Sequence, residues 1–219
     1  VGAPMAATPA PAAVTTGAAY IFTREGAIWT EQKTLEASNK GAGDGFGFSV
    51  SLSGDGASLV VGAIEEDGDA TSTADTPNNS ALNSGAVYFF TGSGANWTQK
   101  AYLKASNTGA EDQFGATVSL NTDGTILAVG AVGEDSDSKV INDVGTDVVE
   151  LNSGAVYVFK GLGATWTQQA YLKASNTGAD DEFGGSLSLS SDGTVLAVGV
   201  PQERGAENGT TDSGAVYLY

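Results

Sequence analysis

The sequence contains neither cysteine nor histidine. Disulfide bonds, thiolate sites and imidazole metal sites are therefore excluded, and any acid–base catalysis would fall to carboxylates. Basic residues are scarce: 9 Lys and Arg stand against 26 Asp and Glu, for a net charge of −17. Nucleic acid and anionic membranes are poor partners for such a chain, and divalent cations are its natural counterions. No apolar run approaches about 18 residues, so we expect no membrane insertion.

One long phrase recurs along the chain. It begins at Trp29, Trp97 and Trp166, and two copies are nearly identical over Ala-Tyr-Leu-Lys-Ala-Ser-Asn-Thr-Gly-Ala. The copies follow one another about every 70 residues, which indicates one structural unit repeated along the chain. The paired acids Glu111–Asp112 and Asp180–Asp181 repeat with it, whereas an active site is normally built once. We therefore expect no enzyme.

Each full copy carries four strand signals. Residues 114–120 alternate with period two, Asp123-Gly124 predicts a tight type I′ hairpin, and 126–130 form an apolar run suited to a strand buried on both faces. Residues 155–159 and 166–173 complete the set. Four antiparallel strands per repeat predict an all-β fold, a β-propeller of four-stranded blades. A β-sandwich would explain the strand spacing but not the near-identity of the copies.

The residues Phe-Gly, Leu-Ala-Val-Gly and Gly-Ala-Val-Tyr of each copy resemble the FG-GAP repeats of integrin α-chain propellers. The wider phrase is more similar to FG-GAP-like repeats of bacterial secreted and surface proteins. The resemblance covers essentially the whole chain and implies a β-propeller in an extracellular or cell-surface protein. It implies no particular ligand, because such propellers serve many.

In the strand order a–b–c–d of that family, the chain is one repeat array. We expect a partial blade (b–c–d) at 1–40, blades at 44–107 and 112–176, and a partial blade (a–b–c) at 181–219. A closed ring needs typically 4–8 blades. We therefore expect a stretch of a longer propeller, or a subunit whose open ends are capped by another molecule, since unpaired edge strands associate readily.

Antiparallel strands predict that the b–c and d–a loops share one face of the array. These loops carry most of the 26 acidic residues, and their charge equals the net charge of the whole chain. The d–a loops hold Asp44, Glu111, Asp112, Asp180, Asp181 and Glu182, and the b–c loops hold Glu65, Glu66, Asp67, Asp69, Asp75, Glu134, Asp135, Asp137, Asp143, Asp147, Glu150, Glu203, Glu207 and Asp212.

Oxygen-rich loops of this kind suit Ca²⁺, which takes 6–8 oxygen ligands. The alternative is a solvated acidic surface that keeps the protein soluble. The candidate ligands are Asp67, Asp69, Asp75, Asp135, Asp137, Asp143 and Asp147, with Asp112 and Asp181 as weaker candidates on the same face.

The calcium motif that the integrin resemblance implies lies on the a–b turn, and here Ser and Leu replace its first and last carboxylates. We therefore interpret Asp55, Asp123 and Asp192 as turn formers. The periodic aromatics Tyr20, Tyr88, Tyr157, Tyr217, Trp29, Trp97 and Trp166 could stack sugars, but packing between blades is the better interpretation. Lys104 and Lys173, at the end of strand d, are interpreted as ordinary edge protection.

These observations predict an extracellular or cell-surface binding or adhesion module with a calcium-binding acidic face for a protein or glycan partner. The alternative is a structural subunit of a polymeric extracellular filament that self-associates, with neighbours completing its partial blades.

Overall fold

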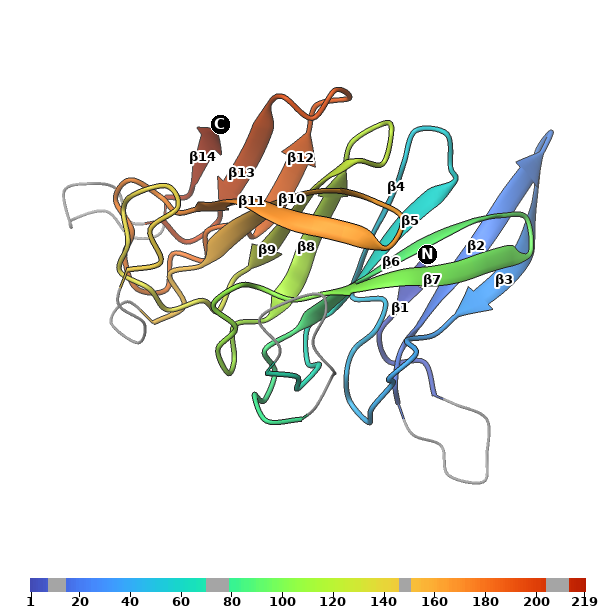
Figure 1. The fold of residues 1–219 in the computed structure, drawn as a ribbon, viewed down its shortest axis with the longest axis horizontal. Helices are drawn as coiled ribbons and strands as arrows, with labels where there is room; N and C mark the ends of the chain where they lie inside the picture. Colours follow the sequence, from blue (N-terminus) through green and yellow to red (C-terminus); the bar gives the residue numbers. More distant parts are fainter. Residues whose placement is uncertain (8–14, 70–78, 146–150, 204–212) are drawn as a thin grey trace.

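The computed structural model describes residues 1–7, 15–69, 79–145, 151–203 and 213–219, and within them all regular structure is β. Four antiparallel sheets stand in an open row that does not close on itself (Figure 1). No helix in the described part of the chain is long and apolar enough to cross a membrane. The fold is thus all-β, built from β-propeller blades.

The sheets follow the chain in order. The first contains β1 (Gly2–Ala3), β2 (Ala18–Glu25) and β3 (Ile28–Leu35), and the second contains β4 (Ser49–Leu52), β5 (Ser58–Ala63), β6 (Ala86–Ser93) and β7 (Asn96–Leu103). The third contains β8 (Phe114–Leu120), β9 (Ile126–Ala131), β10 (Ala155–Leu162) and β11 (Thr165–Leu172), and the fourth contains β12 (Ser186–Leu189), β13 (Leu196–Val200) and β14 (Ala215–Leu218).

In the third sheet, strands β8 and β9 can be compared directly with the sequence pattern that predicted them. β8 begins and ends at the residues that the alternation predicts, and β9 is buried from Leu127 to Ala131, as expected of a short apolar run. The turn between them is not type I′, however. That turn needs positive φ at both central residues, whereas only Gly124 (72°) has it and Asp123 does not. The turns at Asp55-Gly56 and Asp192-Gly193 repeat this geometry.

Neighbouring sheets touch through glycine. A Cβ added to Gly62 on β5 would clash with the Gly115 carbonyl oxygen of the third sheet, and one added to Gly130 on β9 would meet the Gly184 carbonyl oxygen of the fourth. Gly115 and Gly184 also have φ near +97°, a conformation that side chains disfavour. The Phe-Gly and Val-Gly pairs of the repeat are therefore the two halves of one backbone contact.

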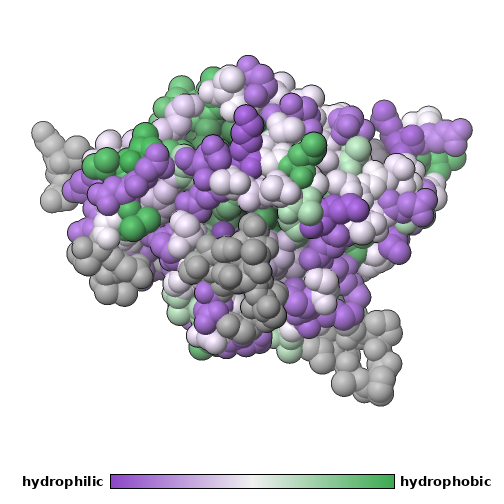
Figure 2. Space-filling view, viewed as in Figure 1, coloured by the Kyte–Doolittle hydropathy of each residue, from purple (hydrophilic) through white to green (hydrophobic). Residues whose placement is uncertain are grey.

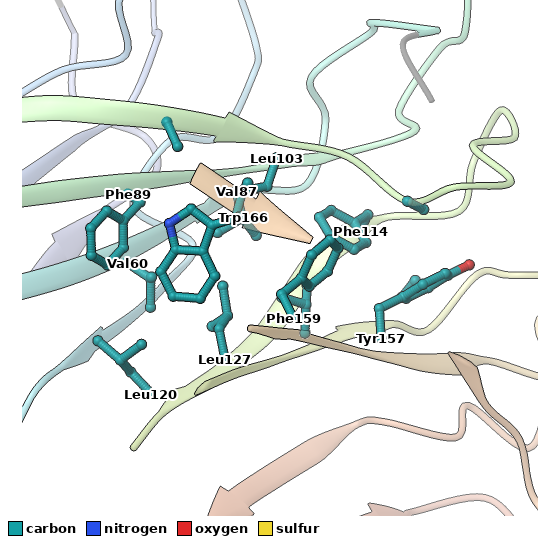
Figure 3. Packing of buried hydrophobic residues seen from close by; sticks show 14 of the residues in the cluster. Val60, Val87, Phe89, Leu103, Phe114, Leu120, Leu127, Tyr157, Phe159 and Trp166 are labelled. Atoms are coloured by element: carbon teal, nitrogen blue, oxygen red, sulfur yellow. The ribbon is translucent and has the colours of Figure 1, made fainter. Parts of the chain in front are cut away.

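Aromatic side chains fill the space between the sheets. Trp166 on β11 packs edge-on against Phe89 of the preceding sheet at a centroid distance of 4.9 Å (Figure 3). Tyr88 and Tyr157 are fully buried, so packing between blades is confirmed for these three aromatics. In the described part of the chain no sheet packs on the preceding side of Trp29, which is 64% exposed. Burial of Trp166 therefore depends on contact with the preceding sheet and not on the repeat position alone.

Candidate functional site

The b–c and d–a loops meet at one end of the row of sheets, which we call the loop rim. It comprises segments 64–69, 79–85, 132–145 and 151–154 of the b–c loops and 104–113 and 173–182 of the d–a loops. The loops lie on the lower side of Figure 1, opposite the β-hairpins. Asn83 Nδ2 donates to Glu111 Oε2 at 3.0 Å, and Asn152 Nδ2 donates to Asp180 Oδ1 at 3.2 Å. These bonds tie each b–c loop to the d–a loop that follows it.

Two of the predicted calcium ligands organise their own loops. Asp67 Oδ1 accepts the N–H of Asn83 at 2.9 Å, and Asp135 Oδ1 accepts the N–H of Asn152 at 2.7 Å. Both asparagines have positive φ, so each aspartate fixes the strained residue that leads into strand c. Asp67 and Asp135 therefore have the same structural role in two copies.

Two other predicted ligands converge within the loop of the third sheet. Asp143 Oδ1 accepts the N–H of Gly145 at 3.1 Å, and a Cβ added to Gly145 would lie 2.7 Å from Asp137 Oδ1. Gly145 has a φ of 59°, which lets the loop turn between the two carboxylates. Asp69 is exposed, and Asp75 and Asp147 lie outside the described residues.

The weaker candidates, Asp112 and Asp181, are buried turn residues. Asp112 Oδ2 accepts the N–H of Gly109 at 2.7 Å, and Asp181 Oδ2 accepts the N–H of Gly178 at 2.8 Å. Asp44 does the same for Gly41, and burial raises the pKa of the Asp44 carboxyl above its ordinary value. Across the described residues, no group of three or more acidic side chains gathers in a way that could hold a metal ion.

The interpretation of Lys104 as edge protection was wrong. Its side chain is fully buried, and its ammonium donates to Glu66 Oε2 at 3.3 Å, Ser84 Oγ at 2.6 Å and the Gly85 carbonyl at 2.5 Å. Burial lowers the pKa of the Lys104 ammonium, and the Glu66 carboxylate opposes that shift. Lys104 therefore joins strand d to the b–c loop of its own sheet.

The third sheet repeats this pair. Lys173 Nζ donates to Glu134 Oε2 at 2.8 Å and to Ser153 Oγ at 2.6 Å, and all three side chains are buried. Tyr171 OH donates to Glu134 Oε1 at 2.7 Å, and burial raises the pKa of this tyrosine well above its usual range.

Each buried glutamate also holds the preceding sheet. Asn39 Nδ2 donates to Glu66 Oε1 at 3.0 Å and Asn107 Nδ2 donates to Glu134 Oε1 at 3.1 Å. In the fourth sheet Asn176 Nδ2 donates to Glu203 Oε1 at 2.6 Å, and Tyr217 OH donates to the same carboxylate. Asn39, Asn107 and Asn176, which share one repeat position, thus each donate a hydrogen bond from one sheet to the next.

The predicted acidic face is correspondingly smaller. Six of the loop carboxylates assigned to it are buried beneath the surface: Asp44, Glu66, Asp112, Glu134, Asp181 and Glu203. Two of them are neutralised by lysines that the sequence analysis had placed elsewhere. The surface charge of the loop rim therefore rests on exposed or half-buried residues such as Glu65, Asp69, Glu111 and Asp180.

The sequence does contain a signal for the buried pair. The first copy has Ala6 where the others have Glu66, Glu134 and Glu203, and Glu36 where the next two have Lys104 and Lys173. The Ala6 N–H donates to Ala3 as the Glu66 N–H donates to Ala63, which confirms the equivalence. Both members of the pair change together, as contacting residues do.

Among the described residues, the hairpin end of the sheets has no buried ion pair. Asp55 Oδ1 accepts from Ser53 Oγ at 2.6 Å and from the Ala57 N–H at 2.9 Å. Hydrogen bonds from Ser190 and Thr194 lower the pKa of Asp192 to about 2. These residues and Asp123 are turn formers, as predicted from the sequence.

Comparison with known families agrees with this architecture. The FG-GAP repeat family matches residues 29–90, 97–159 and 166–219, which together make up most of the chain. Each match begins at the repeat tryptophan and runs through strands a, b and c of the following sheet. A search among curated proteins finds no match to this sequence.

Proposed function

The chain belongs to the FG-GAP repeat family, and from this premise we propose that it is an extracellular binding or adhesion module whose loop rim binds Ca²⁺. Repeats of this family are typically extracellular modules that bind or adhere rather than catalyse. In this proposal the cation orders the loops of the rim for a protein or glycan partner.

One observation carries the calcium proposal. Within the loop of the third sheet, the Asp137 and Asp143 carboxylates both converge on Gly145. Two carboxylates in one loop repel each other unless a cation lies between or beside them. Carboxylate oxygens on a glycine-containing loop are a donor set that suits Ca²⁺. Asp135, at the start of the same loop, has its Oδ1 committed to Asn152 and would supply at most its other oxygen.

The test is a thermal melt of the protein in millimolar Ca²⁺ and in EDTA. At a Ca²⁺ concentration of about 100 times Kd, binding stabilises the folded state by about 2.7 kcal/mol. For a protein of this size that corresponds to a Tm increase of about 5–10 °C. The Asp137→Asn/Asp143→Asn variant should lose most of this increase.

Asp123→Asn is the matched control. It removes one carboxylate charge, half of what the double variant removes, from the opposite end of the third sheet, where Asp123 closes a hairpin, so its Ca²⁺-dependent increase in Tm should equal that of the unchanged protein. Coincident melts of the unchanged protein in Ca²⁺ and EDTA would contradict the proposal, as would an undiminished increase in the double variant.

A second candidate is a structural subunit whose open sheets are completed by neighbours. Trp29 is 64% exposed and Trp166, packed against a preceding sheet, is 4% exposed, so a neighbouring subunit placed against the first sheet would bury Trp29 in the same way. Such a subunit would form large assemblies in sedimentation velocity, whereas the binding module would sediment as a Ca²⁺-dependent monomer.

A further inference from the structure

The buried ammonium group of Lys104 has a defined set of oxygen partners. It is bound by Glu66 Oε2 at 3.3 Å, by Ser84 Oγ at 2.6 Å and by the Gly85 carbonyl oxygen at 2.5 Å. The third sheet holds the Lys173 ammonium in the same way, on a glutamate and a serine. Each of these two sheets therefore contains one buried cation, bound by a carboxylate and a hydroxyl group.

The first sheet has the hydroxyl and the carbonyl of this site but no lysine. Thr16 and Gly17 stand at the positions of Ser84 and Gly85, and the Gly17 N–H donates to the Ala6 carbonyl at 3.1 Å. In the part of the chain that the structure describes, Thr16 Oγ1 is buried without a hydrogen-bond partner. Buried polar groups normally have one, so this hydroxyl indicates that a group binds there.

The comparison between the two hydroxyls is made within each sheet. The partners of Ser84 Oγ are the Glu66 and Gly68 carbonyl oxygens and the Lys104 ammonium, which belong to the same sheet and its b–c loop. The unpartnered hydroxyl of Thr16 is therefore compared with groups of its own sheet, and not with a neighbouring one.

The side chains around the Lys104 ammonium are replaced in the first sheet. Ala6, Thr34 and Glu36 stand where the second sheet has Glu66, Tyr102 and Lys104. Two of the replacements are smaller, and the third exchanges a cation for a carboxylate. Glu36 Oε2 accepts a hydrogen bond from Lys40 at 2.6 Å, and the two side chains are 40% and 41% exposed. The Lys40 ammonium is thus bound at the surface and does not reach the buried hydroxyl.

The surroundings of Thr16 are also negatively charged. The Gly43 N–H donates to the Thr15 carbonyl at 2.7 Å and the Phe46 N–H donates to the Thr16 carbonyl at 3.3 Å, so Asp44 lies on a segment packed against this site. Burial raises the pKa of the Asp44 carboxyl, and neighbouring carboxylates raise it further. A cation beside Thr16 would offset this repulsion.

We propose that the first sheet binds a monovalent cation of ammonium size, K⁺ or NH₄⁺, at the position that the Lys104 ammonium occupies in the second sheet. Thr16 Oγ1 and the Gly17 carbonyl oxygen would bind it directly, and Glu36 would rotate inward to supply a carboxylate. Backbone carbonyl oxygens bind K⁺ in place of water. Hydrophilic residues predominate on the side of the molecule where β3 lies (Figure 2), so the cation can arrive from water.

A monovalent cation suits this position better than Ca²⁺. Ca²⁺ takes 6–8 oxygen ligands, several of them carboxylates, whereas Glu36 brings one carboxylate and the other two groups are neutral. The single positive charge of Lys104 is likewise matched by one carboxylate, that of Glu66. The proposed site is separate from Asp137 and Asp143, and it does not depend on the calcium proposal.

The test is a titration of the ¹⁵N-labelled whole chain, followed by NMR in EDTA at constant ionic strength. KCl replaces tetramethylammonium chloride stepwise, because tetramethylammonium is too large for a site of ammonium size. The backbone amides of Thr16, Gly17 and Phe46 should shift saturably, and NH₄Cl should shift the same amides. With K⁺ at about ten times Kd, Tm should rise by about 3–6 °C.

Glu36→Lys tests the site from the side of the protein. The new lysine stands where Lys104 does in the second sheet, so its own ammonium should take the Thr16 hydroxyl, and K⁺ should bind at least about tenfold more weakly. Glu31→Lys is the matched control. It makes the same change of charge at an exposed position of β3 and should leave the Kd for K⁺ within about twofold.

Thr16→Val keeps the test measurable if Glu36→Lys does not fold. In tetramethylammonium chloride the hydroxyl has no partner, so this variant should melt no lower than the unchanged protein. Because the variant lacks the proposed ligand oxygen, K⁺ should bind to it at least about tenfold more weakly.

The proposal would be overturned by the absence of saturable shifts at these amides, or by undiminished K⁺ binding in Glu36→Lys or Thr16→Val. Equal shifts in LiCl would show a general salt effect and would also overturn it. Displacement of K⁺ by an equal concentration of CaCl₂, in buffer without EDTA, would overturn the choice of a monovalent cation.

Discussion

The first and second sheets share a strand plan but differ at the loop rim. Both pair strands c and d in the same register, with a bulge after Ile21 in one and after Phe89 in the other. In the second sheet a buried Glu66–Lys104 pair ties the b–c loop to strand d. In the first sheet Ala6 and Glu36 stand at these positions, and Glu36 is exposed.

The difference between the two sheets is visible at one hydroxyl group. Ser84 Oγ receives the Lys104 ammonium, but Thr16 Oγ1, at the same repeat position, is buried without a hydrogen-bond partner. The first sheet has the hydroxyl but no lysine at the position of Lys104. Strands c and d therefore pair in the same register without the ion pair. Where the Glu–Lys ion pair is present, it joins the b–c loop to strand d at the loop rim.

The largest effect should come from breaking the pair in the second sheet. Lys104→Met leaves Glu66 buried without a cation, which should lower the free energy of unfolding by about 3–5 kcal/mol. Glu36→Met at the matched position of the first sheet loses only an exposed bond to Lys40 and should cost less than about 1 kcal/mol. Urea unfolding of both variants measures the difference.

If Lys104→Met does not fold, Glu66→Gln/Lys104→Met keeps the comparison measurable, because the remaining side chain is then neutral. It should recover a large part of the loss. Equal destabilisation by Lys104→Met and Glu36→Met would contradict the assigned role of the pair.

A smaller effect of opposite sign should follow from the two hydroxyls. Thr16→Val replaces an unpartnered buried hydroxyl with a methyl group of the same shape and should stabilise the protein by about 1 kcal/mol. Ser84→Ala removes an acceptor of Lys104 and should destabilise it by about 1–3 kcal/mol. The two changes in Tm should therefore differ in sign, and a loss of stability in Thr16→Val would disprove the account of the first sheet.

The smallest effect concerns the a–b hairpins, which the second, third and fourth sheets share. Hydrogen bonds lower the pKa of Asp55, Asp123 and Asp192 below the ordinary 3.8, for Asp192 to about 2. A lowered pKa stabilises the fold above the ordinary value, and this contribution is lost as the pH falls through the folded-state pKa. NMR titration should show all three carboxyl groups protonating below pH 3.8, and midpoints at or above it would refute the shared turn.

The repeat made most of the fold predictable from sequence. Period-two alternation located β8, the apolar run located β9, and the near-identity of the copies required similar sheets in a row. These features depend on residues within a few positions of one another, so they can be read locally. The turn type was missed because the sequence Asp-Gly does not distinguish a type I′ turn from a longer turn with one left-handed glycine.

The site was less predictable, because burial of a charge depends on distant residues. Lys104 donates to Glu66 and Ser84, which lie far from it along the chain. From the sequence alone, a lysine at the end of a strand was therefore expected to be exposed. The carboxylates were likewise located correctly on loops, yet loop membership does not separate Glu66, which is buried, from Glu65, which is exposed. The joint change of Ala6 and Glu36 was the one available clue.

The glycine contact between sheets has a consequence for the geometry of the whole array. Because backbone meets backbone at Gly62–Gly115 and again at Gly130–Gly184, peptide dimensions rather than side-chain sizes set the spacing of the sheets there. Strand c pairs Val87 with Gly62 and Val156 with Gly130, and two residues further along the strand the repeat position varies among Ile21, Phe89, Val158 and Leu218. The pitch of the array is thus held constant by its smallest residue, while the larger ones are left free to diverge.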